Sequence, residues 1–157
     1  MRIGHGYDVH PFADERGLIL GGIAFDGERG LAGHSDGDAL THAVIDALLG
    51  AAAIGDIGMH FPSSDESLRG ADSISLLKRV GRLIAGAGCR IGNIDATVIA
   101  ERPRIAPRVP EMRVRIANAL GLDQSAVSIK ATTTDGLGSI GRGEGIAATA
   151  VALLEDE

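Results

Sequence analysis

Acidic and histidine residues recur in this chain at spacings that would gather them on two different elements. Asp8 and His10 are two residues apart, so on an extended strand their side chains point to the same face. Asp38, His42 and Asp46 recur every four residues, so on a helix they form one stripe. Carboxylates and imidazoles bind metals and carry protons. The two patterns therefore predict one site, built where a strand meets a helix.

A metal centre is the chemistry that this combination favours. Asp8, His10 and His42 would supply three N/O ligands, the usual protein share of a catalytic zinc whose fourth position stays open. A ligating histidine normally donates its other ring N–H to a neighbouring acceptor, and Asp38 or Asp46 would accept it from His42. Each histidine taken singly is more simply a structural residue, and the combined motifs reverse that preference. His5 and His60 are interpreted as structural.

A second chemical signal lies near the C-terminus, where a run of threonines precedes a glycine-rich stretch. The hydroxyls of residues 132–134, the backbone N–H groups of residues 136–143 and Arg142 together resemble a phosphate cradle, although an ordinary loop or strand end would read the same. Asp135 would hold Mg²⁺ against phosphate oxygens. His34 and Ser35 would donate hydrogen bonds to a phosphate. Residues 101–104 stay open between a solvated turn and a cationic part of the site.

The composition limits the classes of partner. The 157 residues correspond by size to a single domain, 1–157, with 15 Lys and Arg against 21 Asp and Glu and a net charge of −6. This balance argues against nucleic acid as a partner. The single cysteine, Cys89, fits a reducing compartment, and the longest apolar run, 47–54, is too short to span a membrane. We therefore expect a cytoplasmic protein without a membrane partner.

Strands and helices alternate in the order that an α+β fold would give. We expect strands over 1–11, 17–25, 90–100, 127–131 and 144–154, and helices over 38–52, 71–87 and 107–120. A polar turn is expected over 13–17 and a loop over 26–37. Aromatic residues make up only 3% of the chain, and the last strand is apolar on both faces. Such a strand needs cover on both sides, which predicts self-association.

Several motifs together resemble the 2-C-methyl-D-erythritol 2,4-cyclodiphosphate synthases of the non-mevalonate isoprenoid pathway. The resemblance runs essentially from end to end. It rests on residues 4–10 (GHGYDVH), 34–50 (HSDGD onward), 55–58 (GDIG), Phe61-Pro62 with Asp65, 130–134 (KATTT) and 141–147 (GRGEGIA). It implies a ferredoxin-like α/β sandwich subunit that assembles as a homotrimer, with active sites between subunits.

The resemblance also implies a reaction and its residues. The enzyme would be a phosphorus–oxygen lyase that converts 4-diphosphocytidyl-2-C-methyl-D-erythritol 2-phosphate to the 2,4-cyclodiphosphate and CMP, with one Zn²⁺ per subunit and with Mg²⁺ or Mn²⁺ on the substrate. Asp8, His10 and His42 would hold the zinc and Asp135 the magnesium. The catalytic residues would be His34, Thr133 and Asp135. The substrate would meet Asp8, His10, His34, Ser35, Asp56, Ile57, Gly58, Phe61, Asp65, Ala100, Arg104, Ile105, Ala106, Thr132, Thr133, Thr134, Asp135, Ser139 and Arg142.

The chain departs from the family pattern at two positions. Asp135 stands where the family usually has Glu, which shortens a metal ligand by one methylene. Ser139 stands where it usually has Phe, which removes an aromatic side chain from the implied cavity on the trimer axis. Two other readings remain open from the residues alone: a zinc phosphohydrolase that uses water as the nucleophile, and a trimeric binding module without catalysis.

Overall fold

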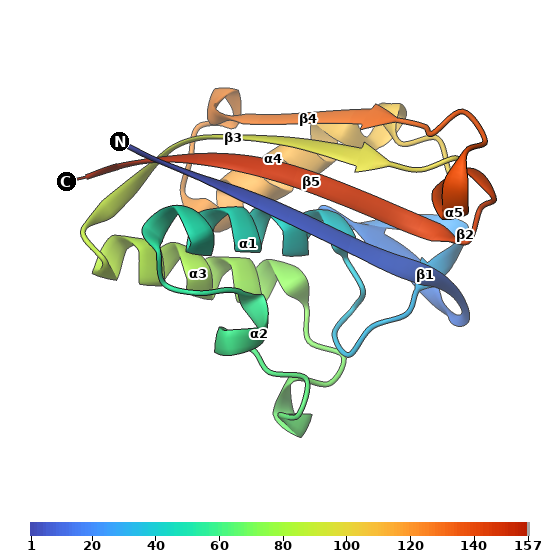
Figure 1. Ribbon diagram of the computed structural model, residues 1–157, viewed down its shortest axis with the longest axis horizontal. Coiled ribbons are helices and arrows are strands. Elements are labelled where there is room, and N and C mark those ends of the chain that lie inside the picture. Colours follow the sequence, from blue (N-terminus) through green and yellow to red (C-terminus); the bar gives the residue numbers. More distant parts are fainter. Residues whose placement is uncertain (157) are drawn as a thin grey trace.

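A five-stranded sheet joins the first and last strands of the chain (Figure 1). The computed structural model describes residues 1–156. The strand order is β2-β1-β5-β3-β4, and every neighbouring pair is antiparallel except β3 and β4. The strands are β1 Arg2–Leu20, β2 Ile23–Leu31, β3 Cys89–Ile99, β4 Val127–Thr132 and β5 Gly145–Asp156. The predicted α+β class is confirmed.

Three long helices pack against this sheet. They are α1 Ala39–Ala52, α3 Ser73–Gly86 and α4 Val109–Leu120, and both ends of each lie within two residues of the predicted ones. Helix α1 packs on β1 and β5, with α3 beside it and α4 beyond (Figure 1). None of the helices in residues 1–156 is both long enough and apolar enough to cross a membrane.

Five short helices were not predicted, because a single turn leaves no periodic pattern in the sequence. They are α2 Ile57–His60, α5 Gly138–Gly141, and the 3₁₀ turns η1 Glu66–Leu68, η2 Ala106–Arg108 and η3 Gln124–Ala126. Side chains of Asp56, Asp65 and Asp123 accept hydrogen bonds from backbone N–H groups at the starts of α2, η1 and η3. Asx-type capping therefore organises the segments between the long elements.

The predicted turn over 13–17 is wrong. Strand β1 continues through this segment to Leu20, and a register irregularity between Ala13 and Gly17 absorbs the extra residues. The chain reverses instead at Gly21 and Gly22, whose φ angles are +57° and +72°. The polar residues Asp14, Glu15 and Arg16 lie on the ribbon formed by β1 and β2, and Asp14 and Glu15 are exposed to water although they are in a strand. The predicted loop over 26–37 likewise begins as the end of β2.

Two glycines let β1 lie unusually close to α1. A Cβ atom built on Gly4 would lie 2.0 Å from the carbonyl oxygen of Ala47, and one built on Gly6 would lie 1.9 Å from that of Ala43. Any side chain at these positions would push the strand away from the helix. The same face of β1 continues to Asp8 and His10, so the glycines bring that end of the strand against the helix that carries His42.

The face of the sheet that is turned away from α1 is partly apolar and uncovered. Ile3, Tyr7 and Val9 on β1 are 71%, 56% and 47% exposed, and Val151 on β5 is 42% exposed. On the other face, alternate residues of the same strands are buried in the core with α1. Cys89 is buried.

Candidate functional site

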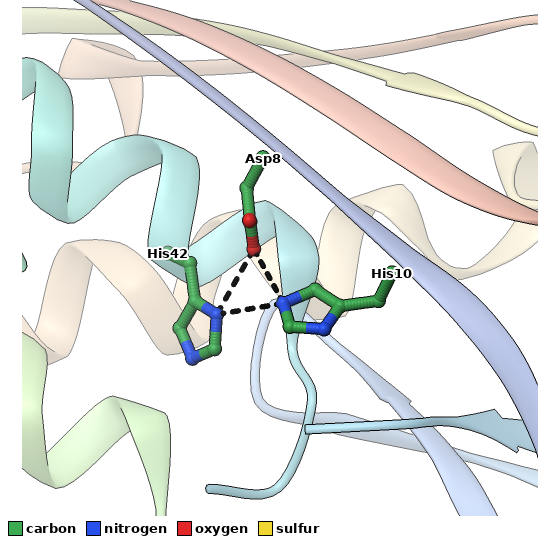
Figure 2. A group of neighbouring side chains, drawn as sticks. All are labelled: Asp8, His10 and His42. Atoms are coloured by element: carbon green, nitrogen blue, oxygen red, sulfur yellow. Dashed lines mark hydrogen bonds and ion pairs between the residues drawn. The ribbon is translucent and has the colours of Figure 1, made fainter. Parts of the chain in front are cut away.

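Asp8, His10 and His42 converge where β1 crosses α1 (Figure 2). Asp8 Oδ2 lies 2.7 Å from His10 Nε2 and 3.0 Å from His42 Nδ1. The two imidazole nitrogens are 3.2 Å apart. Within residues 1–156, this is the one group of three or more such side chains close enough to share a metal ion. The three residues that the strand and helix periodicities singled out in the sequence therefore lie together in the structure.

The charges of the cluster favour a cation at its centre. Burial of Asp8 raises its pKa, but the hydrogen bonds with His10 and His42 outweigh burial and hold that pKa well below its usual value. The hydrogen bond with Asp8 raises the pKa of His10, although burial opposes this shift. Asp8 therefore stays ionised. Its Oδ2 atom and the facing nitrogens of His10 and His42 would be bridged either by a proton or by a metal ion.

The donor set fits a small divalent metal. His10 Nδ1 lies 2.5 Å from the carbonyl oxygen of Ala32, and a carbonyl only accepts, so Nδ1 carries the hydrogen and Nε2 keeps its lone pair toward the cluster. Ligand atoms of a tetrahedral zinc with bonds of about 2.0–2.1 Å are roughly 3.3 Å apart. The observed 2.7–3.2 Å therefore needs an expansion of only a few tenths of an ångström.

The cluster opens into a cleft of about 280 Å³. A mixture of polar and apolar side chains forms its walls, and most of them were predicted to meet substrate. The lining residues are Asp8, His10, His34, Ser35, His42, Ile57, Gly58, Phe61, Ser63, Leu68 and Leu76. The three side chains of the cluster thus line a space that is open to a small molecule.

Asp38 and Asp46 do not serve His42, and that prediction is wrong. Asp38 is fully buried, and its carboxylate accepts hydrogen bonds from the backbone N–H groups of Gly21 and Gly22 and from Thr41. Asp46 accepts one from the backbone N–H of Ile57. Helical periodicity placed the carboxylates on one stripe, but each is drawn to unpaired backbone donors that only the tertiary fold supplies.

Two further acidic residues support the cleft without lining it. Asp56 caps α2, where its side chain accepts from the N–H of Met59. Asp65 caps η1, and its backbone carbonyl accepts a hydrogen bond of 3.0 Å from His34 Nε2. This bond leaves His34 Nδ1 as the ring nitrogen available to a ligand.

A second and larger cavity, of about 500 Å³, gathers another set of the predicted residues. Thr134 is held beside it, because its N–H and hydroxyl both donate to the Glu101 carboxylate. Residues 101–104, whose role the sequence did not decide, all line this cavity. The lining residues are Glu28, Ala100, Glu101, Arg102, Pro103, Arg104, Ile105, Ala106, Ala131, Thr132 and Thr133. This cavity and the cleft share no lining residue.

The remaining predicted residues lie on the loop after β4. Asp135 is exposed in a left-handed conformation, φ +53°, and its side chain accepts from the Thr133 hydroxyl. Ser139 is exposed on α5. Arg142 pairs with Glu144 and lines a further cavity, of about 590 Å³, which shares Glu28, Glu101 and Arg102 with the 500 Å³ cavity.

Sequence reasoning missed Ser73 and Asp36. His42 Nε2 lies 2.9 Å from Ser73 Oγ, which in turn lies 2.5 Å from Asp36 Oδ1. Ser73 begins α3, and Asp72 is its N-cap. We expected the helix to begin at residue 71, which hid Ser73 as one more polar residue of its first turn.

Comparisons with known proteins identify the family. A protein named 2-C-methyl-D-erythritol 2,4-cyclodiphosphate synthase from Geotalea uraniireducens is 58% identical over 155 residues, 99% of both chains. One of the same name from Clostridium perfringens is 55% identical, over 98% of this chain and 99% of its own. The fold matches the bifunctional IspDF of Campylobacter jejuni with a TM-score of 0.96 and 40% identity, over 99% of this chain and 42% of that longer one. It matches IspF of Plasmodium falciparum in a CDP complex with a TM-score of 0.87 and 34% identity, over 99% and 96% of the chains. The YgbB family model matches residues 1–155. The chain therefore belongs to the YgbB family, together with the 2-C-methyl-D-erythritol 2,4-cyclodiphosphate synthases.

Proposed function

We propose that the protein converts 4-diphosphocytidyl-2-C-methyl-D-erythritol 2-phosphate to 2-C-methyl-D-erythritol 2,4-cyclodiphosphate and CMP. An oxygen of the 2-phosphate attacks the β-phosphorus, and the bond from that phosphorus to the oxygen bridging it to CMP breaks. The observation that carries this proposal is the Asp8–His10–His42 cluster at the mouth of a small cleft, in a chain that matches synthases of this name over nearly its full length.

Zinc is the metal we propose for the cluster, because two imidazole nitrogens and one carboxylate oxygen form a ligand set typical of that ion. When bound, the metal supplies a positive charge that polarises a phosphoryl oxygen. Asp8 and His10 approach it from one strand and His42 from one helix, so the bound phosphate would meet a fixed array rather than a mobile loop. The substrate carries its own nucleophile, so positioning and charge neutralisation matter more than a general base.

The walls of the cleft suit the erythritol and phosphate part of the substrate. His34 Nδ1 and the Ser35 hydroxyl face it as polar groups, and Ile57, Gly58 and Phe61 provide apolar surface. Asp56 and Asp65, at the adjoining caps, are our candidates to bind the sugar hydroxyls. His34 and Ser35 would hydrogen-bond to the phosphoryl oxygens, on which negative charge develops during the reaction.

We propose that the larger cavity binds the cytidine part of the substrate, with Ala100, Arg104, Ile105 and Ala106 around the base and Thr132, Thr133 and Thr134 near the phosphates. The structure of IspF of Plasmodium falciparum is that of a CDP complex, which supports a nucleotide ligand. Asp135 would hold Mg²⁺ or Mn²⁺ on the diphosphate, with Ser139 and Arg142 farther along the same loop. Such an ion keeps several waters and needs only one or two carboxylates.

A homotrimer would bring the two cavities together. Within one chain they share no lining residue, and we propose that one substrate molecule binds to the cleft of one subunit and to the nucleotide cavity of its neighbour. The uncovered side chains of Ile3, Tyr7, Val9 and Val151 offer an apolar surface for that association. Light scattering should give the mass of three chains. A fully active species of one or two chains would exclude this arrangement.

The reaction is tested by incubating the protein with the diphosphocytidyl substrate and following CMP release with and without a chelator. We expect CMP and the cyclic diphosphate in equal amounts, and loss of both after chelation. An opened, hydrolysed product would instead indicate a zinc phosphohydrolase, and binding without turnover would indicate a module that lacks catalysis. We also propose that this chemistry takes place in the cytoplasm.

A further inference from the structure

The ring nitrogen of His42 that points away from the cluster meets two serine hydroxyls. His42 Nε2 lies 2.9 Å from Ser73 Oγ and 3.0 Å from Ser35 Oγ. Ser73 is fully buried, and it comes from the first residue of α3, a different element from those that carry the three ligands. The Nε2 side of the ring is therefore held by side chains of two separate segments.

The direction of the proton in this chain follows from Asp36. Ser73 Oγ lies 2.5 Å from Asp36 Oδ1, and an ionised carboxylate only accepts, so the Ser73 hydroxyl donates its hydrogen to Asp36. The oxygen of Ser73 is then an acceptor for His42. The ring must supply the hydrogen from Nε2, which leaves the lone pair on Nδ1 toward Asp8 and His10.

Asp36 is itself fixed by backbone donors. Its Oδ2 accepts a hydrogen bond of 2.9 Å from the N–H of Ser73, and its Oδ1 accepts one of 3.1 Å from the N–H of Asp38. The carboxylate thus joins the loop before α1 to the start of α3. It cannot turn away from the Ser73 hydroxyl without leaving these two N–H groups unpaired.

We propose that Asp36 and Ser73 are positioning residues, which hold His42 in the Nε2–H tautomer so that its Nδ1 lone pair is directed at the metal. The inference rests on the metal site proposed above and extends it to two residues outside the ligand set. Hydrogen-bond partners of metal-bound histidines fix the orientation of the ring and contribute to metal affinity.

The arrangement also sets the hydroxyl of Ser35. Because Nε2 carries the hydrogen and has no lone pair to offer, Ser35 Oγ at 3.0 Å can only accept on this side, and it shares that one hydrogen with Ser73 Oγ. The Ser35 O–H is left to donate into the cleft, where a phosphate oxygen would accept it. One relay from Asp36 therefore prepares both the metal ligand and a phosphate-binding hydroxyl.

The two histidine ligands are oriented by different means. His10 Nδ1–H donates to the backbone carbonyl of Ala32, which no side-chain substitution removes. His42 depends on the side chains of Ser73 and Asp36. Of the two, only the orientation of His42 can therefore be tested by a substitution that leaves the ligand itself in place.

The decisive variant is Ser73→Ala, which removes the hydroxyl but keeps the N–H that donates to Asp36. Its matched control is Ser75→Ala. Ser75 lies in the first turn of the same helix, and its hydroxyl also donates to an aspartate, Asp72, but it does not touch His42. Zn²⁺ affinity is measured by competition with a chromophoric chelator. In the zinc-loaded proteins, solvent exchange of the His42 Nε2–H proton is measured by NMR.

We expect Ser73→Ala to bind Zn²⁺ about 10- to 100-fold more weakly than the wild type, with a faster-exchanging Nε2–H proton, and Ser75→Ala to match the wild type in both. Unchanged affinity and unchanged exchange in Ser73→Ala would overturn the inference. His42→Ala separates the two levels of the argument. If it loses Zn²⁺ while Ser73→Ala does not, only the positioning role fails. If His42→Ala keeps full zinc, the metal site is wrong and the inference falls with it.

Discussion

Asp46 lies one helical turn after His42 on α1, and its carboxylate accepts a hydrogen bond of 2.7 Å from the backbone N–H of Ile57. The contact fixes the start of α2, whose residues Ile57 and Gly58 form a wall of the cleft. Burial raises the pKa of Asp46, although the Ile57 N–H opposes this shift. A single helix therefore positions both His42 and the wall of the cleft that faces it.

Replacing Asp46 should separate substrate binding from metal binding. In Asp46→Ala the Ile57 N–H loses its acceptor, and we expect the KM for the diphosphocytidyl substrate to rise about tenfold, equivalent to roughly 1.4 kcal/mol for a hydrogen bond to a charged group. Zinc content should stay at the wild-type level. Asp46→Asn keeps an acceptor oxygen and should restore most of the affinity. A loss of zinc in Asp46→Ala would show that the contact acts through α1 instead.

The buried carboxylate of Asp38 should be a major contributor to stability. It accepts from Gly21, Gly22 and twice from Thr41, and an amide presents only one acceptor atom to these donors. Asp38→Asn should lower the free energy of unfolding by about 1–3 kcal/mol, measured by denaturant titration. The control is Asp14→Asn, which changes an exposed aspartate on β1. Equal stability of the two variants would contradict this role.

The stability of the metal-free protein should fall as the pH rises through neutrality. The His10 pKa is raised above 6.5, so its contribution is fully present below that pH and is lost above the folded-state pKa. The Asp8 pKa is lowered below 3.8, so its contribution is present above that pH and is lost on strong acidification. Asp8 and His10 together therefore stabilise the metal-free protein most between pH 3.8 and pH 6.5, the ordinary pKa values of the two groups. The effect on stability is measured by thermal unfolding of the metal-free wild type and of metal-free His10→Gln from acid pH to above neutrality. A variant with the same pH dependence would refute it.

Asp135 should be needed for turnover that depends on Mg²⁺, although its side chain is one methylene shorter than the usual residue of the family. Its carboxylate is exposed and is steadied by the Thr133 hydroxyl. We expect Asp135→Ala to lower kcat by at least about tenfold at saturating Mg²⁺ and to leave zinc content unchanged. Asp135→Glu should be active. Undiminished Mg²⁺-dependent turnover in the alanine variant would remove Asp135 from the site.

The metal cluster was predictable from the sequence because its geometry is local. The spacing of Asp8 and His10 on a strand decides that they share a face, and the periodicity of the helix around His42 decides which side is apolar. The three long helices were predictable for the same reason. Their meeting point required only that the strand and the helix pack together.

The partners of the acidic residues could not be predicted, because they depend on contacts far apart in the sequence. Asp38 is drawn to a hairpin turn 16 and 17 residues earlier, and Asp36 to a serine 37 residues later. The turn at Gly21 and Gly22 was predicted too early, at 13–17, because the polar residues Asp14, Glu15 and Arg16 lie on the ribbon of β1 and β2. A run of polar residues indicates that a segment is exposed to water. On such a ribbon both a strand and a turn are exposed, so the run does not distinguish them.

The close approach of β1 and α1 means that the spacing of Asp8, His10 and His42 is encoded partly in residues outside that cluster. Gly4 and Gly6 carry no side chain, and this absence sets how near the strand that bears Asp8 and His10 comes to the helix that bears His42. A related sequence could keep all three ligands and still lose the centre through a methyl group at either glycine. Recognition of such centres in new sequences should therefore require the full pattern G-x-G-x-D-x-H before the helix, and not the ligands alone.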